Sequence, residues 1–282
     1  MTNMTNEDYH ADTSAISASG LKLFMRSPAH YYAAYLDPTR IERTPTAAMK
    51  LGTATHCAIL EPERFNAEYA VMPDGLDRRT TAGKQAYADL MATGAEILSA
   101  DEMAQVMNMA CAFRDNEISR ALFDRKHAVE QSIYATVNGV SCKCRPDFIT
   151  SDFLLVMDVK TTSDASPEGF GKSAWNLGYH VQAAFYRRVI SEATGTTPDF
   201  IFGCVESERP HLVAYYSVPQ YLLDYADGLI DCALERYAEC MRSGVWPGYV
   251  SAIEMQELNV PGYAQRIIEQ DGIETWEISH VE

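Results

Sequence analysis

The stretch AVEQSIYATVNGVSCKCRPDFITSDFLLVMDVKT, residues 128–161, decides the fold of this chain of 282 residues. Apolar and polar residues alternate through 128–137 and 140–149, and Asn138-Gly139 between them is a strong signal for a two-residue β-hairpin turn. Residues 153–161 are strongly apolar, as expected of a strand that is covered on both faces. The sequence therefore predicts three consecutive strands, the first two joined as a hairpin.

Helical patterns flank these strands on both sides. The expected helices before them are 20–26, 28–36, 46–60, 84–91 and 101–113, the last capped by Asp101. The expected elements after them are helices at 168–177 and 179–193, strands at 201–206 and 211–218, and a helix at 219–244. The fold class is thus α/β (α+β) with a mixed sheet. We expect a flexible N-terminus (1–13), a helical region (14–126), a core (127–245) and an acidic C-terminal tail (246–282).

The acidic residues are unevenly distributed along the chain. The formal net charge is −16, which at face value argues against a nucleic-acid partner. Residues 189–282 hold 16 of the 39 acidic groups and only 4 of the 23 basic ones, whereas residues 140–188 hold 6 basic and 5 acidic groups. The charge objection is therefore weaker for the core, where a bound divalent cation would raise the local potential further.

Seven scattered cysteines and a polar, acidic N-terminus indicate reduced thiols in the cytoplasm, without a signal peptide or a membrane partner. Cys142 and Cys144 lie two apart on an expected strand, where buried small side chains are more common than metal ligands.

Three polar residues lie near the ends of the second and third expected strands. Asp147 lies near the end of the second strand, and Asp158 and Lys160 leave the same face of the third. Adjacent carboxylates repel unless a cation lies between them, and oxygen ligands suit Mg²⁺. A nearby lysine can stabilise charge that develops on a phosphate. The pattern predicts a site for phosphodiester hydrolysis, while a plain ion pair of Lys160 with Asp147 or Asp158 stays open.

These residues resemble the PD-(D/E)xK nucleases. Pro146-Asp147 followed by Asp158-Val159-Lys160 matches their signature, and Gln182 with Tyr186 matches the QxxxY motif of the RecB-like and λ-exonuclease-like branch. The flanks ISASGLKLFMRSPAHYYAAYL, LGTATHCAILEPERF and DRRTTAGKQAY are similar to the nuclease family of RecE, or exonuclease VIII, over about residues 14–245. The resemblance implies a restriction-endonuclease-like core.

The resemblance also implies roles. Asp147, Asp158, the Val159 carbonyl and His56 would be metal ligands, and Lys160 and Glu130 would be catalytic. The residues implied in binding DNA are Gln182, Tyr186, Thr161, Arg78, Arg79 and Arg145. Purely structural explanations also remain open. They are a core histidine for His56, an exposed strand carboxylate for Glu130, and a solvated loop for the arginines near Lys84.

As a member of this family the chain would degrade linear duplex DNA from 5′ to 3′, leaving 3′ single strands for recombination in a prophage. It would need Mg²⁺, with Mn²⁺ as a substitute, and neither ATP nor an iron–sulfur cluster, because Cys232 and Cys240 do not fit the cluster spacing. The resemblance further implies a homotetramer and a RecT-like single-strand annealing partner.

Four other functions remain open. An endonuclease or a helicase-dependent nuclease module would share the fold. A non-catalytic DNA-end-binding module would have no need of all three residues Asp147, Asp158 and Lys160. A hydrolase built on Cys57 and His56 has poor geometry, because adjacent helical residues point about 100° apart.

Overall fold

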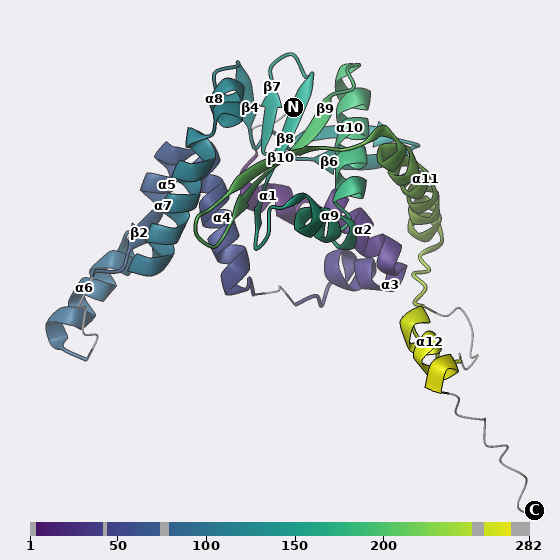
Figure 1. Cartoon of the computed structure of the whole chain (residues 1–282), viewed down its shortest axis with the longest axis horizontal. Helices are drawn as coiled ribbons and strands as arrows, with labels where there is room; N and C mark the ends of the chain where they lie inside the picture. The colour runs from purple at the N-terminus through teal and green to yellow at the C-terminus, as the bar shows by residue number, and fades with distance from the viewer. Residues whose placement is uncertain (1–3, 42–43, 74–78, 250–256, 272–282) are drawn as a thin grey trace, which may run out of the picture. The chain divides into compact units, whose positions relative to one another are not determined.

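The computed structural model describes residues 4–41, 44–73, 79–249 and 257–271 (Figure 1). The chain divides into two compact units, residues 1–246 and 247–282. The second unit contains helix α12 (Gly262–Asp271), and every described strand lies in the first unit. None of the described helices combines the length and the apolar character that a bilayer crossing requires.

A five-stranded mixed sheet is the centre of the first unit. Its order is β10-β9-β8-β7-β4, with β8 and β9 parallel and the other pairs antiparallel. The bounds are β4 (His127–Val129), β7 (Phe148–Thr150), β8 (Leu155–Thr162), β9 (Asp199–Glu206) and β10 (Val213–Ser217). The smaller sheets are β1-β6-β5, from β1 (Ile16–Ser17), β5 (Ile133–Val137) and β6 (Val140–Cys144), and the parallel pair β2 (Tyr69–Val71) and β3 (Glu96–Leu98). This mixed α/β architecture confirms the predicted fold class.

The predicted hairpin exists, but each of its strands is divided between two sheets. The turn has the expected form, with positive φ at Asn138 and Gly139 and Val137 paired with Val140. The first strand breaks at Glu130, whose φ of 49° lies in the left-handed region that disfavours an ordinary residue. The second breaks before Asp147, after a proline that cannot donate to a ladder. The breaks place Asp147 at the entrance to β7.

Helices cover both faces of the large sheet (Figure 1). On one face α2 (Ala18–Arg26), α10 (Tyr179–Thr194) and α11 (Gln220–Ser243) share a buried cluster with the sheet. On the other, α4 (Ala47–Leu60) and α7 (Ala100–Asp115) share a second cluster. Along β8 the side chains alternate between these clusters, so Asp158 and Lys160 lie on the face of α10.

Gly203 of β9 shows how closely the second helical layer approaches the sheet. A β-carbon at this position would lie 2.7 Å from the ring of Phe113 on α7. Only glycine leaves room for this aromatic ring, because a real contact of that length does not occur.

The remaining described helices are α1 (Asn6–Ala11), α3 (Pro28–Tyr31), the π-helix η1 (Tyr32–Leu36), α5 (Pro62–Glu68), α6 (Thr81–Ala92), α8 (Glu117–Phe123) and α9 (Pro167–Asn176). Two expectations are wrong. Residues 4–13 are not a flexible terminus, because α1 folds there with Tyr9 buried. The cap of α7 is Ser99 and not Asp101, because Ser99 and Glu102 form a reciprocal capping box.

Candidate active site

Asp147 and Asp158 face each other across strands β7 and β8. The pairing of Phe148 with Met157 sets this register, and both carboxylates are buried, Asp158 to all but 2% of its surface. Asp147 Oδ2 accepts a hydrogen bond of 2.7 Å from the backbone N–H of Val159. Burial, followed by the negative charge of Asp158, raises the pKa of Asp147 well above its ordinary value. The two carboxylates therefore form a pair that favours a bound proton or cation.

The ammonium group of Lys160 lies beside this pair. Its Nζ is 2.5 Å from Asp158 Oδ2 and 4.6 Å from the ring centre of Tyr179. Burial alone would lower the pKa of Lys160, but the attraction of Asp158 and Asp147 outweighs it, and the pKa is raised. The lysine is thus held protonated. The ion pair that the sequence left open is present, within an arrangement that also contains the second carboxylate.

His56 reaches the same site from helix α4. Its Nδ1 lies 3.5 Å from Asp147 Oδ2, and 27% of its side-chain surface is exposed. Burial, with a smaller contribution from the charge of Lys160, lowers the pKa of His56 to about 4. The ring is therefore neutral at pH 7 and retains a nitrogen lone pair, which is the form that binds metals.

Arg145 and Glu130 form an ion pair behind Asp147. Arg145 Nε donates to Glu130 Oε2 at 2.7 Å, and Nη1 donates to the carbonyls of Met4 and Thr5 at 3.1 and 3.2 Å. Only 9% of Arg145 is exposed. The guanidinium of Arg145 is thus engaged with other residues of this chain while it lines the site, and its expected contact with DNA stays a prediction. Burial raises the pKa of Glu130 although Arg145 opposes the shift.

Gln182 and Tyr186 lie one turn apart on α10 and both contact the site. Gln182 Nε2 donates to Asp158 Oδ1 at 2.6 Å, and its Oε1 accepts from Lys160 Nζ at 3.3 Å. The hydroxyl of Tyr186 donates to the carbonyl of Arg145 at 3.3 Å. The polar atoms of this motif are thus engaged with the site residues themselves.

These side chains line one pocket of about 840 Å³. Its acidic, basic and polar members include His56, Glu61, Arg64, Glu130, Arg145, Asp147, Asp158, Lys160, Thr161, Gln182 and Tyr186. Arg79 is exposed and is not among the lining residues, and Arg78 lies outside the described residues. One wall of the pocket was not predicted from the sequence, and α1 supplies it through Asn6, Tyr9 and His10. Thr5 followed three residues later by Asp8 is a pattern typical of a helix start, and it could have predicted α1. In the structure Thr5 caps α1, and its hydroxyl donates to Asp8 at 2.7 Å.

The donor set suits a hard divalent cation. Asp147 and Asp158 offer carboxylate oxygens, and His56 offers a neutral nitrogen. Lys160 contacts Oδ2 of Asp158 and Gln182 contacts Oδ1, and an ionised carboxylate has about four lone-pair sites, so acceptor capacity for a cation remains. In the described ranges no three His, Cys, Asp or Glu side chains are already grouped closely enough to enclose a metal. The residues that would hold a divalent cation are Asp147, Asp158 and His56, with the Val159 carbonyl that the resemblance implies.

A mixed sheet between two helical layers, with Asp147 facing Asp158 and Lys160 on the same strand face, defines a PD-(D/E)xK-type domain. Residues 17–259 match the model of the family described as "PDDEXK-like domain of unknown function (DUF3799)", and the chain belongs to this family. No curated protein is significantly similar to it in sequence.

Solved structures of other proteins are similar to this chain, and the first of those that follow shares its fold. A protein from Eubacterium rectale, provisionally named an exonuclease, is 14% identical, with a TM-score of 0.65 over 96% of this chain and 99% of its own. A phage-related exonuclease from Haemophilus somnus is 13% identical, with a TM-score of 0.33 over 68% of this chain and 95% of its own. An alkaline exonuclease from Laribacter hongkongensis is 13% identical, with a TM-score of 0.28 over 68% of this chain and 90% of its own.

Proposed function

We propose that this chain is a metal-dependent exodeoxyribonuclease that degrades linear double-stranded DNA from its ends without ATP. One observation carries the proposal: two buried carboxylates and a protonated lysine, Asp147, Asp158 and Lys160, meet in one open pocket. Apposed buried carboxylates are unfavourable in a purely structural site, so their presence side by side supports a cation-binding function.

Each residue has a defined part in the proposed hydrolysis. Asp147 and Asp158, with His56 and the Val159 carbonyl, would hold Mg²⁺, which supplies positive charge where negative charge develops on the phosphate. Lys160 would orient the attacking water or stabilise the phosphate oxygens through its ammonium group. Gln182 contacts both Asp158 and Lys160, and therefore fixes their separation.

The finer assignments rest on the resemblance to RecE-type nucleases. They are the 5′ to 3′ direction, the 3′ single-stranded product, its use in recombination with a RecT-like annealing protein, and the homotetramer. The proposed cytoplasmic location rests instead on the seven scattered cysteines and the polar N-terminus. Gln182 and Tyr186 support the assignment to this branch, because they lie on the catalytic face of α10 as the motif requires.

The test uses linear duplexes that carry a label on either the 5′ or the 3′ end, with Mg²⁺ and without ATP. We expect early release of the 5′ label and no cleavage of covalently closed circles, and Asp158→Asn should be inactive. Cleavage of circles would indicate an endonuclease. A requirement for an added helicase would indicate a dependent module. Binding of ends without hydrolysis by the wild type would indicate a non-catalytic module.

A further inference from the structure

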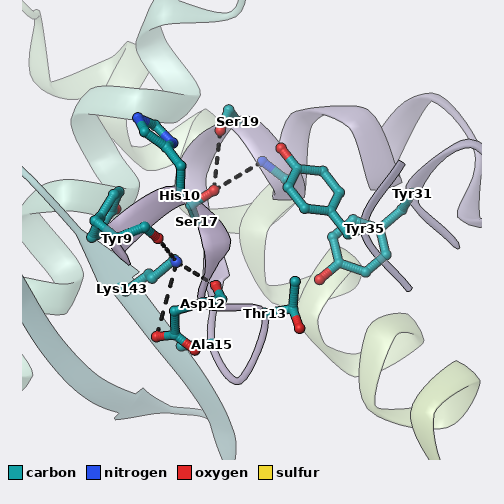
Figure 2. A pocket seen from close by; sticks show the side chains of 11 residues that line it. Tyr9, His10, Asp12, Thr13, Ala15, Ser17, Ser19, Tyr31, Tyr35 and Lys143 are labelled. Carbon is teal, nitrogen blue, oxygen red and sulfur yellow. Dashed lines mark hydrogen bonds and ion pairs between the residues drawn. The ribbon is translucent and has the colours of Figure 1, made fainter. Parts of the chain in front are cut away.

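Helix α1 is fastened to strand β6 by a buried lysine (Figure 2). Lys143 is 4% exposed, and its Nζ donates to the carbonyl of Tyr9 and, at 2.5 Å, to that of Asp12. The last carbonyls of a helix have no partner within the helix, so a cation is well placed there. Lys143 therefore closes the C-terminal end of α1.

Arg145 fastens the other end of the same helix. It follows Lys143 by two residues, and its guanidinium binds the carbonyls of Met4 and Thr5 just before α1. The ring of Tyr9 lies near both cations, 4.3 Å from Lys143 Nζ and 5.6 Å from Arg145 Cζ. Rings at these distances attract cations, and more strongly where water is excluded. Residues 4–12, which we call the N-terminal clamp, are thus held along their whole length.

The contacts continue from the clamp to the backbone of Asp147. Arg145 binds the carboxylate of Glu130, and the backbone N–H of Glu130 donates to the carbonyl of Asp147 at 3.2 Å. The carbonyl of Arg145 accepts from Tyr186. Residues 145–147 are therefore held by these three contacts, and the side chain of Arg145 also binds two carbonyls of the clamp.

We infer that the N-terminal clamp is a positioning element of the active site, which sets the place of Asp147 through Arg145 and Glu130. The inference rests on the proposed function, because it concerns the residues that would bind the cation. The clamp has no part in bond breaking. Its effect is on how closely Asp147 can approach Asp158 and His56, and hence on cation affinity.

The test compares Tyr9→Leu, Tyr9→Phe and Lys143→Met in the full chain. For each variant the half-saturating Mg²⁺ concentration is measured twice, from the rise in melting temperature and from nuclease rate. Tyr9→Leu removes the ring between the cations, and Lys143→Met frees the end of α1. Both should raise the half-saturating concentration about tenfold, as loss of a supporting contact does at metal sites. Tyr9→Phe keeps the ring and should stay within about twofold of wild type.

Leu234→Ala is the matched control, because Leu234 is fully buried in α11 and distant in sequence from the clamp. It should lower the melting temperature while leaving the Mg²⁺ requirement unchanged. If Tyr9→Leu and Lys143→Met only lower the melting temperature in the same way, the clamp contributes stability alone and the inference is overturned. A wild type that neither responds to Mg²⁺ nor cleaves DNA would instead remove the proposed function.

Discussion

One ammonium group serves two buried carboxylates at the centre of the pocket. Lys160 lies 2.5 Å from Asp158, and the charge of Asp147 also raises the pKa of Lys160. A single positive charge cannot neutralise both carboxylates. A divalent cation would offset the remaining negative charge. Because Lys160 and the two carboxylates carry opposite charges, mutations of the lysine and of the carboxylates should have different effects.

Lys160→Ala should lose turnover while DNA binding persists. An interaction that strengthens in the transition state affects rate more than ground-state binding. We expect a loss of roughly a hundredfold in rate and near-normal binding of DNA ends in Ca²⁺. Lys160→Arg should rescue poorly, because a guanidinium is planar and not a compact ammonium. Normal cutting of weakly bound DNA would show that Lys160 is an anchor instead.

Asp147→Asn should remove activity and yet stabilise the metal-free protein. The pKa of Asp147 is raised in the folded state from its ordinary 3.8, so ionisation of this group disfavours folding. The stability that its protonated form contributes is complete below about pH 3.8 and is lost as pH rises through the raised pKa. Melting temperatures in EDTA at pH 7 should therefore be higher for Asp147→Asn by about 3 °C. An equal or lower melting temperature would contradict this prediction.

His56→Ala should raise the Mg²⁺ or Mn²⁺ concentration needed for activity. The neutral ring lies 3.5 Å from Asp147 and can supply a ligand nitrogen. Loss of a ligand weakens the site without removing the carboxylates. Rates measured across a metal titration test the prediction, and a lowered melting temperature with unchanged metal dependence would mark His56 as a core histidine.

Helix α10 supports the site with two residues that make different numbers of hydrogen bonds to it. Gln182 bridges Asp158 and Lys160, whereas Tyr186 makes one bond of 3.3 Å to a backbone carbonyl. The bridge needs both an amide donor and a carbonyl acceptor, which only an amide side chain provides. The amide of Gln182 is therefore the more demanding requirement.

Gln182→Glu should reduce the rate by at least about tenfold, because it removes the donor to Asp158 and adds a third carboxylate. Tyr186→Phe keeps the packing and should cost less than about threefold in rate, because one neutral bond contributes little. Steady-state rates at saturating Mg²⁺ give the comparison. A larger loss for Tyr186→Phe than for Gln182→Glu would reverse the assignment of roles along α10.

Local signals predicted the elements whose stability is local. Asn138-Gly139 fixes a turn with positive φ, and alternation on β8 places Asp158 and Lys160 together. The break at Glu130 was not predictable, because nothing in the neighbouring residues favours a left-handed φ there. Helix α1 is six residues long, which is too short to be stable without the distant residues Lys143 of β6 and Arg145, which follows that strand.

At the scale of the whole molecule, negative charge is densest along the sequence in residues 247–282, which carry a net charge of −6 out of the total of −16. Residues 247–282 form a separate unit with seven acidic residues and one arginine. Trp246, the last residue of the first unit, packs against Phe24, Tyr31 and Tyr237. The boundary between the units therefore follows an aromatic cluster that belongs to the first.

A chain that ends at Trp246 should keep its melting temperature within about 2 °C, because the aromatic cluster is retained. It should bind duplex DNA more tightly at low salt, because it loses a net charge of −6 that repels phosphate. The difference should shrink at 0.15 M salt, where the screening length is about 8 Å. Titrations in Ca²⁺ at two salt concentrations measure it. Weaker DNA binding by the shortened chain would show that residues 247–282 assist binding.

The pairing of charges within the pocket makes its two ligands interdependent. Arg64, Arg145 and Lys160 each already pair with a carboxylate of this chain. Little attraction for a phosphate remains until a cation neutralises the acidic side chains. Thermodynamic coupling is reciprocal, so whatever factor the cation adds to the affinity for a DNA end, the DNA end must add to the affinity for the cation. Under the proposed function, the protein would bind its cation most tightly while it is bound to DNA. A free DNA end would then bind the protein and the cation together.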